Sequence, residues 1–350
     1  MAPNPVLVAK RMERIRSDLG VTDDASWYIK HEEIEFTKKI GSGTSGKVFK
    51  GLYKNKKVAI KVLKTEDQSV EEEFKKEFRV LSVLTSPHIV EFIGACFEPK
   101  LCMVMEFCSY GSLYHVLSNK DIKVDWDMAF KFAIEMIAGL NCLHTWNPPI
   151  FHRDMKSLNI LVNEHWEVKL TDFGLARFNT ADNMRTLANM VGTIGWTAPE
   201  LLGGAGYTAR SDIYSAAIIL WEIFTRVLTG SYQQPFKEYA LKDQQIMILT
   251  MEKALRPTIP ATCYPDLAAL IRRAWDPEPD KRPDCVEIFS KLEEIHKIYF
   301  KNPAEWIAGA WADGLTSEST SMPSTTATGA TDTLGSVANT QQSVGSLDAN

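Results

Sequence analysis

Two acidic residues near the middle of the chain constrain its fold more than any other feature. Asp154 lies in the segment His-Arg-Asp-Met-Lys-Ser-Leu-Asn, and Asp172 lies in Thr-Asp-Phe-Gly, eighteen residues further on. Lys156 and Asn159 stand between the two acids. An acidic loop between two helices is the alternative interpretation, but it would not account for the other motifs of the chain. We therefore expect a fold that brings these four side chains to one place.

Two carboxylates, an amide and a lysine at these offsets suit one kind of chemistry. The carboxylate of Asp154 can receive the proton of an attacking hydroxyl. The carboxylate of Asp172 and the amide oxygen of Asn159 can hold metal ions. Phosphoryl transfer from a magnesium nucleotide requires this combination of groups.

The overall composition limits the classes of protein. The 350 residues suffice for one large two-lobed domain or two ordinary ones, and 45% apolar with 24% charged residues is typical of globular chains. A net charge of −5 argues against nucleic acid as a partner. The six cysteines form no CxxC pair and indicate a reducing compartment. No apolar stretch is long enough to span a bilayer, so we expect a cytoplasmic protein without a transmembrane segment.

The residues before the first strand pattern, 1–33, predict a short basic amphipathic helix. Val8, Met12, Ile15 and Leu19 share one helical face, and lysines and arginines lie among them. Such a helix can pack on the chain's own domain. Docking to a partner, dimerisation or binding to a membrane surface remain alternatives.

The middle of the chain divides into a strand-rich part and a helical part. Residues 34–108 contain five short runs rich in β-branched and aromatic residues, interrupted by one charged helix near 70–84. Residues 109–299 carry helical periodicity, including an almost wholly apolar helix over 210–225. A strand-rich lobe followed by a helical lobe predicts an α+β fold.

The end of the chain changes in composition. Asn302-Pro303 is typical of a helix start and predicts a short helix within 300–312 that includes Trp306 and Trp311. Residues 313–350 are dominated by Ser, Thr, Gly and Ala and lack aromatic residues, so we expect a disordered tail.

A glycine-rich segment near the N-terminus is ambiguous by itself. It comprises Gly41, Ser42, Gly43, Thr44, Ser45, Gly46, Lys47 and Val48. The phosphate loop of P-loop NTPases needs a hydroxyl after Lys47, and Val48 has none. The dinucleotide fingerprint needs a helix after the last glycine, whereas a strand pattern follows here. The sequence therefore favours a strand–turn–strand cover over phosphates, in which backbone amides approach the anion.

Together these motifs resemble the eukaryotic protein kinase superfamily from about Ile34 to Tyr299. The motifs appear in the family's order: GxGxxGxV at 41–48, Val-Ala-Ile-Lys at 58–61, His-Arg-Asp-x-Lys-x-x-Asn at 152–159, Asp-Phe-Gly at 172–174 and Ala-Pro-Glu at 198–200. The segments at 89–97 and 192–200 look most similar to the tyrosine-kinase-like group, with its Raf-like and mixed-lineage members. The resemblance implies a bilobal fold, an antiparallel N-lobe sheet with one helix over 34–108 and a mostly helical C-lobe over 109–299.

The resemblance also implies an activity and its residues. The chain would transfer the γ-phosphate of ATP to serine or threonine hydroxyls of protein substrates. Lys61 would contact the α- and β-phosphates, and Glu77 would pair with it. Asp154 would accept the substrate proton, and Lys156 would reach the γ-phosphate. Asn159 and Asp172 would hold two Mg²⁺ ions, or Mn²⁺ in their place.

Other positions would complete the nucleotide site and its support. The adenine pocket would include Ala59, Met105 as the gatekeeper residue, the hinge Glu106 to Cys108, and Leu161. A regulatory spine would comprise Leu81, Phe92, His152 and Phe173, anchored by Asp212. Glu200 and Arg282 would form a buried ion pair. Glu71, Glu72 and Glu73 are expected to form a solvated first turn of the helix that carries Glu77.

The sequence constrains the substrate specificity and the regulation of the activity less tightly. Lys156 and Thr193 favour serine and threonine substrates, but Trp-Thr-Ala-Pro-Glu at 196–200 also fits tyrosine kinases, so dual specificity stays open. Arg153 needs a negative partner, which phosphorylation of Thr180 or Thr186 would supply, by an upstream kinase or by autophosphorylation. Both threonines can also be ordinary loop residues.

Several rival functions share these motifs. A catalytically weak pseudokinase scaffold, a small-molecule phosphotransferase and an adaptor acting through the two ends of the chain are the alternatives. The segment 226–239 can dock partners or form a solvated loop.

Overall fold

The computed structural model describes residues 17–18, 27–42, 46–63, 68–178 and 194–308. The tail 313–350, Trp311 and most of the basic helix expected before residue 20 lie outside these ranges. Thr180, Thr186 and Thr193 also lie outside them.

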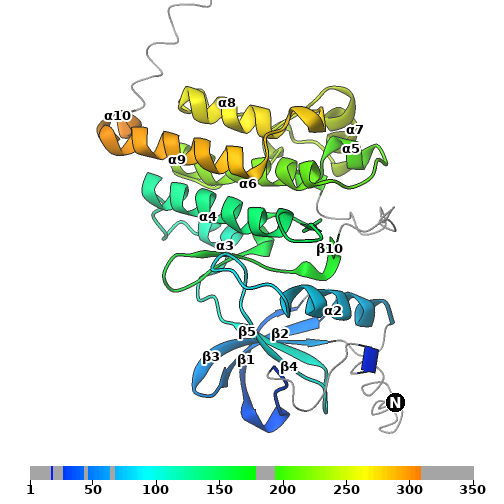
Figure 1. Cartoon of the computed structure of the whole chain (residues 1–350). Coiled ribbons are helices and arrows are strands. Elements are labelled where there is room, and N and C mark those ends of the chain that lie inside the picture. Colours follow the sequence, from blue (N-terminus) through cyan, green and yellow to red (C-terminus); the bar gives the residue numbers. More distant parts are fainter. Residues whose placement is uncertain (1–16, 19–26, 43–45, 64–67, 179–193, 309–350) are drawn as a thin grey trace, which may run out of the picture. The chain divides into compact units, whose positions relative to one another are not determined.

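A five-stranded antiparallel sheet forms the first half of the fold (Figure 1). Its strand order is β1-β2-β3-β5-β4. The α2 helix joins β3 to β4 and lies between the sheet and the helical part (Figure 1). The bounds are β1 (Ile34–Ser42), β2 (Gly46–Tyr53), β3 (Lys56–Leu63), α2 (Gln68–Leu81), β4 (Phe92–Cys96) and β5 (Cys102–Glu106). The five predicted strands and the charged helix are confirmed.

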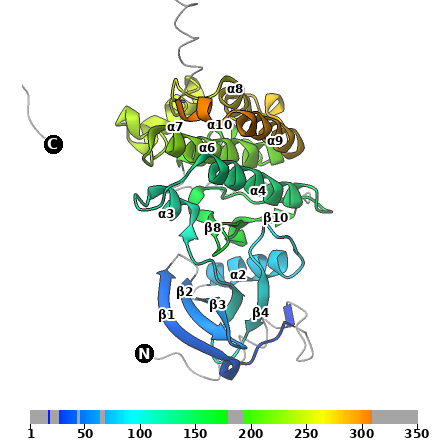
Figure 2. The same ribbon diagram turned by 90° about the vertical axis from the view of Figure 1, so that its left-hand side faces the viewer.

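Helices stack above the sheet in the second half (Figures 1 and 2). They are α3 (Leu113–Ser118), α4 (Trp126–His144), α5 (Pro199–Leu202), α6 (Ala209–Thr229), α7 (Asp243–Glu252), α8 (Pro265–Ala274), α9 (Cys285–Lys301) and α10 (Pro303–Ala308). Short strands lie among them: β6 (Gly111–Ser112), β7 (Ile150–Phe151), β8 (Ile160–Val162), β9 (Val168–Leu170) and β10 (Arg177–Phe178). The α+β prediction of a bilobal kinase fold is confirmed.

Local sequence explains where these helices begin and end. The side chain of Asp125 accepts a hydrogen bond from the backbone N–H of Met128 at the start of α4, and Asp284 caps α9 in the same way. The α6 helix ends at Thr229 and is followed by Gly230, which has a φ of 72° that glycine adopts at no steric cost. The predicted C-terminal helix begins at Pro303, where proline loses no helical hydrogen bond.

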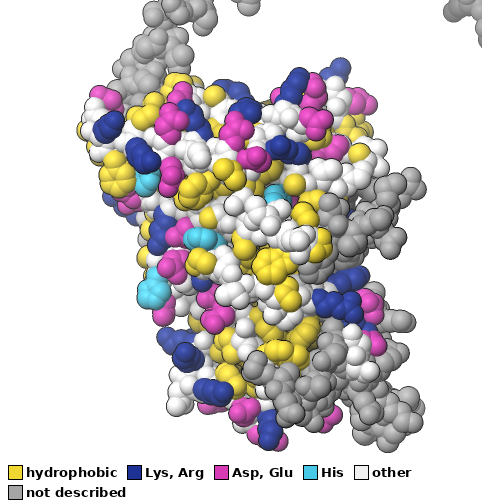
Figure 3. All heavy atoms as spheres, in the orientation of Figure 1, with side chains coloured by type: hydrophobic (Ala, Val, Ile, Leu, Met, Phe, Trp, Pro, Cys, Tyr) yellow, Lys and Arg dark blue, Asp and Glu magenta, His cyan; other side chains and the backbone are white. Residues whose placement is uncertain are grey.

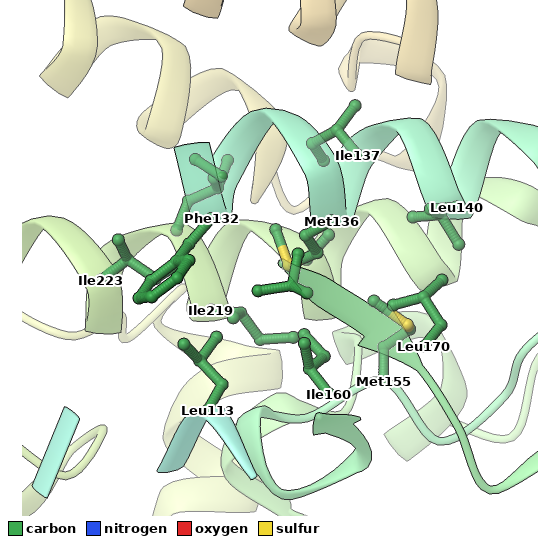
Figure 4. Close-up of a cluster of buried hydrophobic side chains, with 14 of the residues drawn as sticks. Leu113, Phe132, Met136, Ile137, Leu140, Met155, Ile160, Leu170, Ile219 and Ile223 are labelled. Atoms are coloured by element: carbon green, nitrogen blue, oxygen red, sulfur yellow. The ribbon is translucent and has the colours of Figure 1, made fainter. Parts of the chain in front are cut away.

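The main hydrophobic core lies directly behind the loop that carries the His-Arg-Asp motif (Figure 4). Met155 of that loop is 2% exposed, between Asp154 and Lys156. Its apolar neighbours come from α3, α4, β8, β9 and α6, and include Leu113, Phe132, Met136, Ile137, Leu140, Ile160, Leu170, Ile219 and Ile223 (Figure 4). Close packing of this kind fixes the loop's backbone while its polar residues stay outside the core.

The segment 226–239 packs on the domain at both of its ends. Arg226 is buried and donates to the carbonyls of Leu117, Ile122 and Gly230. Phe236 is 1% exposed. The solvated-loop interpretation is therefore wrong for these two residues, because the hydrogen bonds of Arg226 compensate its burial.

The expected ion pair between Glu200 and Arg282 is confirmed. The two side chains form parallel hydrogen bonds of 2.8 Å and 2.7 Å, and the guanidinium of Arg282 is fully buried. Arg282 also donates to the backbone carbonyls of Asp276 and Arg210. This pair therefore links α5 to the first turn of α6 and to the segment between α8 and α9.

Substituting Arg282→Ala should lower the free energy of unfolding by about 3–5 kcal/mol, because it leaves the largely buried carboxylate of Glu200 without its charged partner and with only the hydroxyl of Ser211 as a described donor. Urea denaturation measures the change. The matched control is Lys281→Ala, since the side chain of that neighbouring lysine is exposed and pairs with the equally exposed Glu278. An equal shift in the two variants would contradict the assignment.

Candidate active site

The register of the sheet aligns several residues expected to bind a nucleotide. Gly41 of β1 lies opposite Val48 of β2, and Val48 lies opposite Lys61 of β3. Ala59 lies opposite Met105 of β5. Directly paired residues and residues two apart share one face of a sheet, so Val48, Ala59, Lys61 and Met105 share the face that carries Lys61.

The two described motif glycines differ in what surrounds them. A Cβ atom at Gly46 would lie 2.5 Å from the carbonyl oxygen of Val62, so the pairing of β2 with β3 requires glycine there. A Cβ at Gly41 would meet only Val48, at 3.7 Å. Strand pairing alone therefore explains Gly46, and the predicted approach of an anion to the backbone is not needed for it. Gly43, Thr44 and Ser45 lie outside the described residues, and Ser42 is exposed at the end of β1.

Lys61 lies between two acids from distant parts of the chain. Its ammonium is 2.5 Å from Glu77 Oε2 and 3.6 Å from Asp172 Oδ1. Phe74 and Leu81, on either side of Glu77, are each 1% exposed and hold α2 in place. Burial opposes the charged form of Lys61, but Glu77 and Asp172 raise its pKa well above its usual range. The lysine therefore stays charged and joins the sheet, α2 and the Asp-Phe-Gly segment.

The first turn of α2 differs from its expected solvation. Glu71 is 1% exposed, and its carboxylate lies 3.0 Å from the ammonium of Lys75. Glu72 lies 3.3 Å from the same ammonium with its side chain half exposed. The prediction is wrong for Glu71, because the basic partner four residues later compensates its burial.

Asp154 is held by two neighbours in its own loop. Lys156 Nζ lies 2.7 Å from Asp154 Oδ2, and Asn159 Nδ2 donates to the same oxygen at 2.8 Å. Asn159 Nδ2 also donates to the backbone carbonyl of Asp154, which fixes its amide plane. This leaves Asn159 Oδ1 and Asp154 Oδ1 for other partners.

A buried carboxylate from α6 holds the backbone of this loop from behind. Asp212 is fully buried and accepts hydrogen bonds from the backbone N–H groups of His152 and Arg153, at 2.9 Å and 3.0 Å. Burial works against its charged form, but hydrogen bonding and charge from His144 lower the pKa of Asp212. Arg153 has a φ of 69°, and this left-handed backbone is kept by the two bonds to Asp212.

The loop and the Asp-Phe-Gly segment contact each other directly. His152 Nε2 lies 3.0 Å from the carbonyl oxygen of Thr171, and its ring lies 5.1 Å from that of Phe173. Phe173 and Leu81 are both buried in the main core, and Phe92 packs against it. Asp172 has a φ of 64°, in the left-handed region, so the chain turns sharply at this carboxylate.

Two residues offer oxygen ligands for a magnesium ion. Asp172 keeps half of its side chain exposed, and Asn159 Oδ1 is free of the loop contacts described above. Among the described residues, no group of three or more His, Cys, Asp or Glu side chains could hold a metal. Magnesium commonly takes one or two protein ligands and completes its shell with phosphate oxygens and water, so this donor set fits a nucleotide-bound ion.

The residues expected to contact adenine line the junction of the sheet and the helical part. Met105 and Cys108 are buried, and Leu161 of β8 is half-buried. Burial raises the pKa of the Cys108 thiol to about 12, so it remains neutral. The side chain of Glu106 accepts a hydrogen bond from the backbone of Glu91 and lies 3.4 Å from Lys169, so it serves the structure of this junction.

Glu222 of α6 is a functional candidate that the motifs did not reveal. It is fully buried, and Oε1 accepts from Ser157 and Tyr232 while Oε2 accepts from Trp196. Burial raises the pKa of Glu222 to about 7, although these three hydrogen bonds oppose the rise. The available signal was one acid within the apolar stretch 215–224, which must be neutral or hydrogen-bonded.

Glu222→Gln should remove part of the pH dependence of stability. The folded chain binds the proton of Glu222 more tightly than the unfolded chain, so the stabilisation is present below about pH 4.5 and is lost as the pH rises through 7. As the pH rises over this range, the free energy of unfolding of the variant should therefore increase by up to about 3 kcal/mol relative to that of the wild type. Thermal unfolding of both proteins from pH 5 to 8 measures it, and parallel pH curves would contradict it.

Comparison with known proteins agrees with this geometry. The family model described as protein tyrosine and serine/threonine kinase matches residues 34–292. Stress-activated protein kinase alpha of Dictyostelium discoideum is 53% identical over 281 residues, which cover 79% of this chain and 44% of the relative. A probable serine/threonine-protein kinase of the same organism is 50% identical over 292 residues, 82% of this chain and 34% of the relative.

A third relative is named as a tyrosine kinase. A probable tyrosine-protein kinase of Dictyostelium discoideum is 36% identical over 293 residues, 78% of this chain and 82% of the relative. The chain spans less than half the length of the first two relatives. With a family model over most of its described residues, the chain belongs to the protein tyrosine and serine/threonine kinase family.

Proposed function

We propose that this chain transfers the γ-phosphate of magnesium ATP to serine and threonine hydroxyls of proteins. The observation that carries the proposal is the position of Lys61 between Glu77 and Asp172, on the sheet face that also carries Val48 and Ala59. A cation held in this way can neutralise phosphate oxygens without moving during the reaction.

The remaining polar residues take roles around the transferred group. Asp154 Oδ1, which no described loop contact occupies, would accept the proton of the substrate hydroxyl. Lys156 would shift from Asp154 to a γ-phosphate oxygen, since its ammonium is a mobile point charge. Asn159 and Asp172 would hold magnesium, or manganese, which neutralises developing charge on the phosphates. Catalysis would then rest chiefly on positioning and electrostatics.

The specificity proposal rests on one residue and on the relatives. Lys156 contacts Asp154 directly and so lies where serine and threonine kinases use a lysine. Two relatives are named as a stress-activated and a probable serine/threonine kinase, and one as a probable tyrosine kinase. We propose that the chain belongs to the tyrosine-kinase-like group. We also propose that it acts on serine and threonine, with dual specificity as the alternative. A pseudokinase scaffold is less well supported, because all the motif acids and Lys61 are present.

Cell context and control follow from the same proposal. A role in signalling and a cytoplasmic location would fit a kinase of this kind. No helix in the described part of the chain has the length and apolar character to cross a membrane. Phosphorylation at Thr180 or Thr186 would supply the negative partner that Arg153 needs, and an upstream kinase or the chain itself would add it.

Asp172→Asn should reduce incorporation of labelled phosphate into a Ser/Thr/Tyr peptide library by about 100-fold or more, since it removes a charged metal ligand. Asp121→Asn, in an exposed turn, is the matched control and should retain full activity. The same assay reports the acceptor residue. A wild-type chain without activity, or an Asp172→Asn variant with full activity, would contradict the proposal.

Phosphatase treatment should lower the activity of the wild-type chain about tenfold or more, because Arg153 then lacks its anionic partner. The Thr180→Ala/Thr186→Ala double variant should start at this low level and lose nothing further on treatment. Equal activity of the double variant and the phosphorylated wild type would rule out both threonines.

A further inference from the structure

The segment before β1 contacts the helix that carries Glu77. Its described parts, residues 17–18 and 27–33, lie outside the matched family region, which begins at residue 34. Asp18 contacts α2, and residues 27–29 contact both α2 and β4. Glu77 depends on α2 for its position, so these contacts bear on the ion pair with Lys61.

The first contact is electrostatic. Lys75 Nζ lies 2.7 Å from Asp18 Oδ2, and the side chain of Lys75 is 5% exposed. Arg79 donates to the backbone carbonyl of Asp18 at 3.4 Å. Lys75 and Arg79 are one helical turn apart and lie on either side of Glu77. Basic and acidic side chains also lie together on the surface that α2 occupies (Figure 3). Asp18 therefore binds two basic residues in the central turns of α2.

The second contact is aromatic. The ring of Trp27 lies 4.9 Å from that of Phe78 in an edge-to-face arrangement. Phe78 follows Glu77 directly, is 3% exposed, and also contacts the ring of Phe92 at 5.4 Å. Trp27 lies 6.2 Å from Phe97. Edge-to-face pairs of this kind favour one relative position of the two rings.

Backbone hydrogen bonds hold Trp27 itself in place. Ala95 of β4 donates to the carbonyl of Trp27, and Ile29 donates to the carbonyl of Ala95, both at 2.9 Å. A Cβ atom at Gly94 would lie 2.3 Å from the carbonyl oxygen of Trp27, so glycine is required for this approach. Ile29 is 1% exposed in the second core cluster. The sheet therefore fixes the tryptophan, and the tryptophan fixes Phe78.

We propose that Asp18 and Trp27 are positioning residues, which hold α2 where Glu77 reaches Lys61. The N-terminal segment is then an intramolecular activator that acts on α2 from outside the nucleotide site. This inference rests on the proposed kinase activity for its functional consequence, but its effect on α2 is independent of that activity.

The test compares Trp27→Ala and Asp18→Asn with controls of the same chemistry, Phe300→Ala and Asp121→Asn. Phe300 is 62% exposed on α9, and Asp121 lies in an exposed turn. We expect kcat to fall about tenfold in Trp27→Ala, since an aromatic contact of this geometry can shift an equilibrium by that factor. Asp18→Asn should lower it about threefold, Asp18→Glu should restore it, and both controls should match the wild type.

Two readouts separate positioning from general loss of structure. Hydrogen exchange should become faster in peptides from α2 and stay unchanged in peptides from α6 and α9. In a Glu77→Gln background, Trp27→Ala should lower kcat less than about twofold, because the two changes act through the same ion pair. The proposal would be overturned if hydrogen exchange in α2 were the same in the variants and the wild type. It would also be overturned if Trp27→Ala lowered kcat by the same factor in the wild-type and Glu77→Gln backgrounds. If the wild type transfers no phosphate, the proposed function fails, and the exchange of α2 alone decides the present inference.

Discussion

The contact of Lys61 with Glu77 and Asp172 is the constraint on which the rest of the structure depends. Each of the three residues belongs to a different element: β3, α2 and the segment after β9. β3 and α2 follow each other along the chain, whereas the segment after β9 is far from both in sequence. Because Lys61 is largely withdrawn from water, its charge requires acids from both other elements. A displacement of α2 or of Asp172 would leave a charged group without its partner, so the arrangement behaves as a unit.

The helical part supplies the fixed frame for this unit. Asp212 and Glu222 lie on α6 among apolar residues, and each uses its carboxylate oxygens to hold loop groups. Asp212 holds the backbone before Asp154, whereas Glu222 connects Ser157 to Trp196. Polar groups so deeply buried are costly unless fully hydrogen-bonded, so they define the loop positions closely. The main core below Met155 then provides the rigidity that these hydrogen bonds require.

Much of this arrangement could be predicted from sequence, for physical reasons that differ between elements. The strands and helices follow from hydrophobic periodicity and from caps such as Asp125 and Asp284, which act locally. Glu77 could be chosen among four neighbouring acids because Phe74 and Leu81 mark the inward face of the helix, on which Glu77 also lies. The spacing of Glu71 and Lys75 permits an ion pair, but the burial of Glu71 could not be predicted, because it depends on what packs over that face of α2 in the fold. Glu222 was missed for a different reason, since its partners Ser157, Trp196 and Tyr232 all lie in other segments of the chain.

A crystal structure of the chain with magnesium and a non-hydrolysable ATP analogue tests the central claim most directly. The account predicts phosphates beside Lys61, metal bound to Asp172 and Asn159 Oδ1, and an unbroken contact between Lys61 and Glu77. A nucleotide bound elsewhere, or phosphates in the cleft with Lys61 turned away from them, would contradict it.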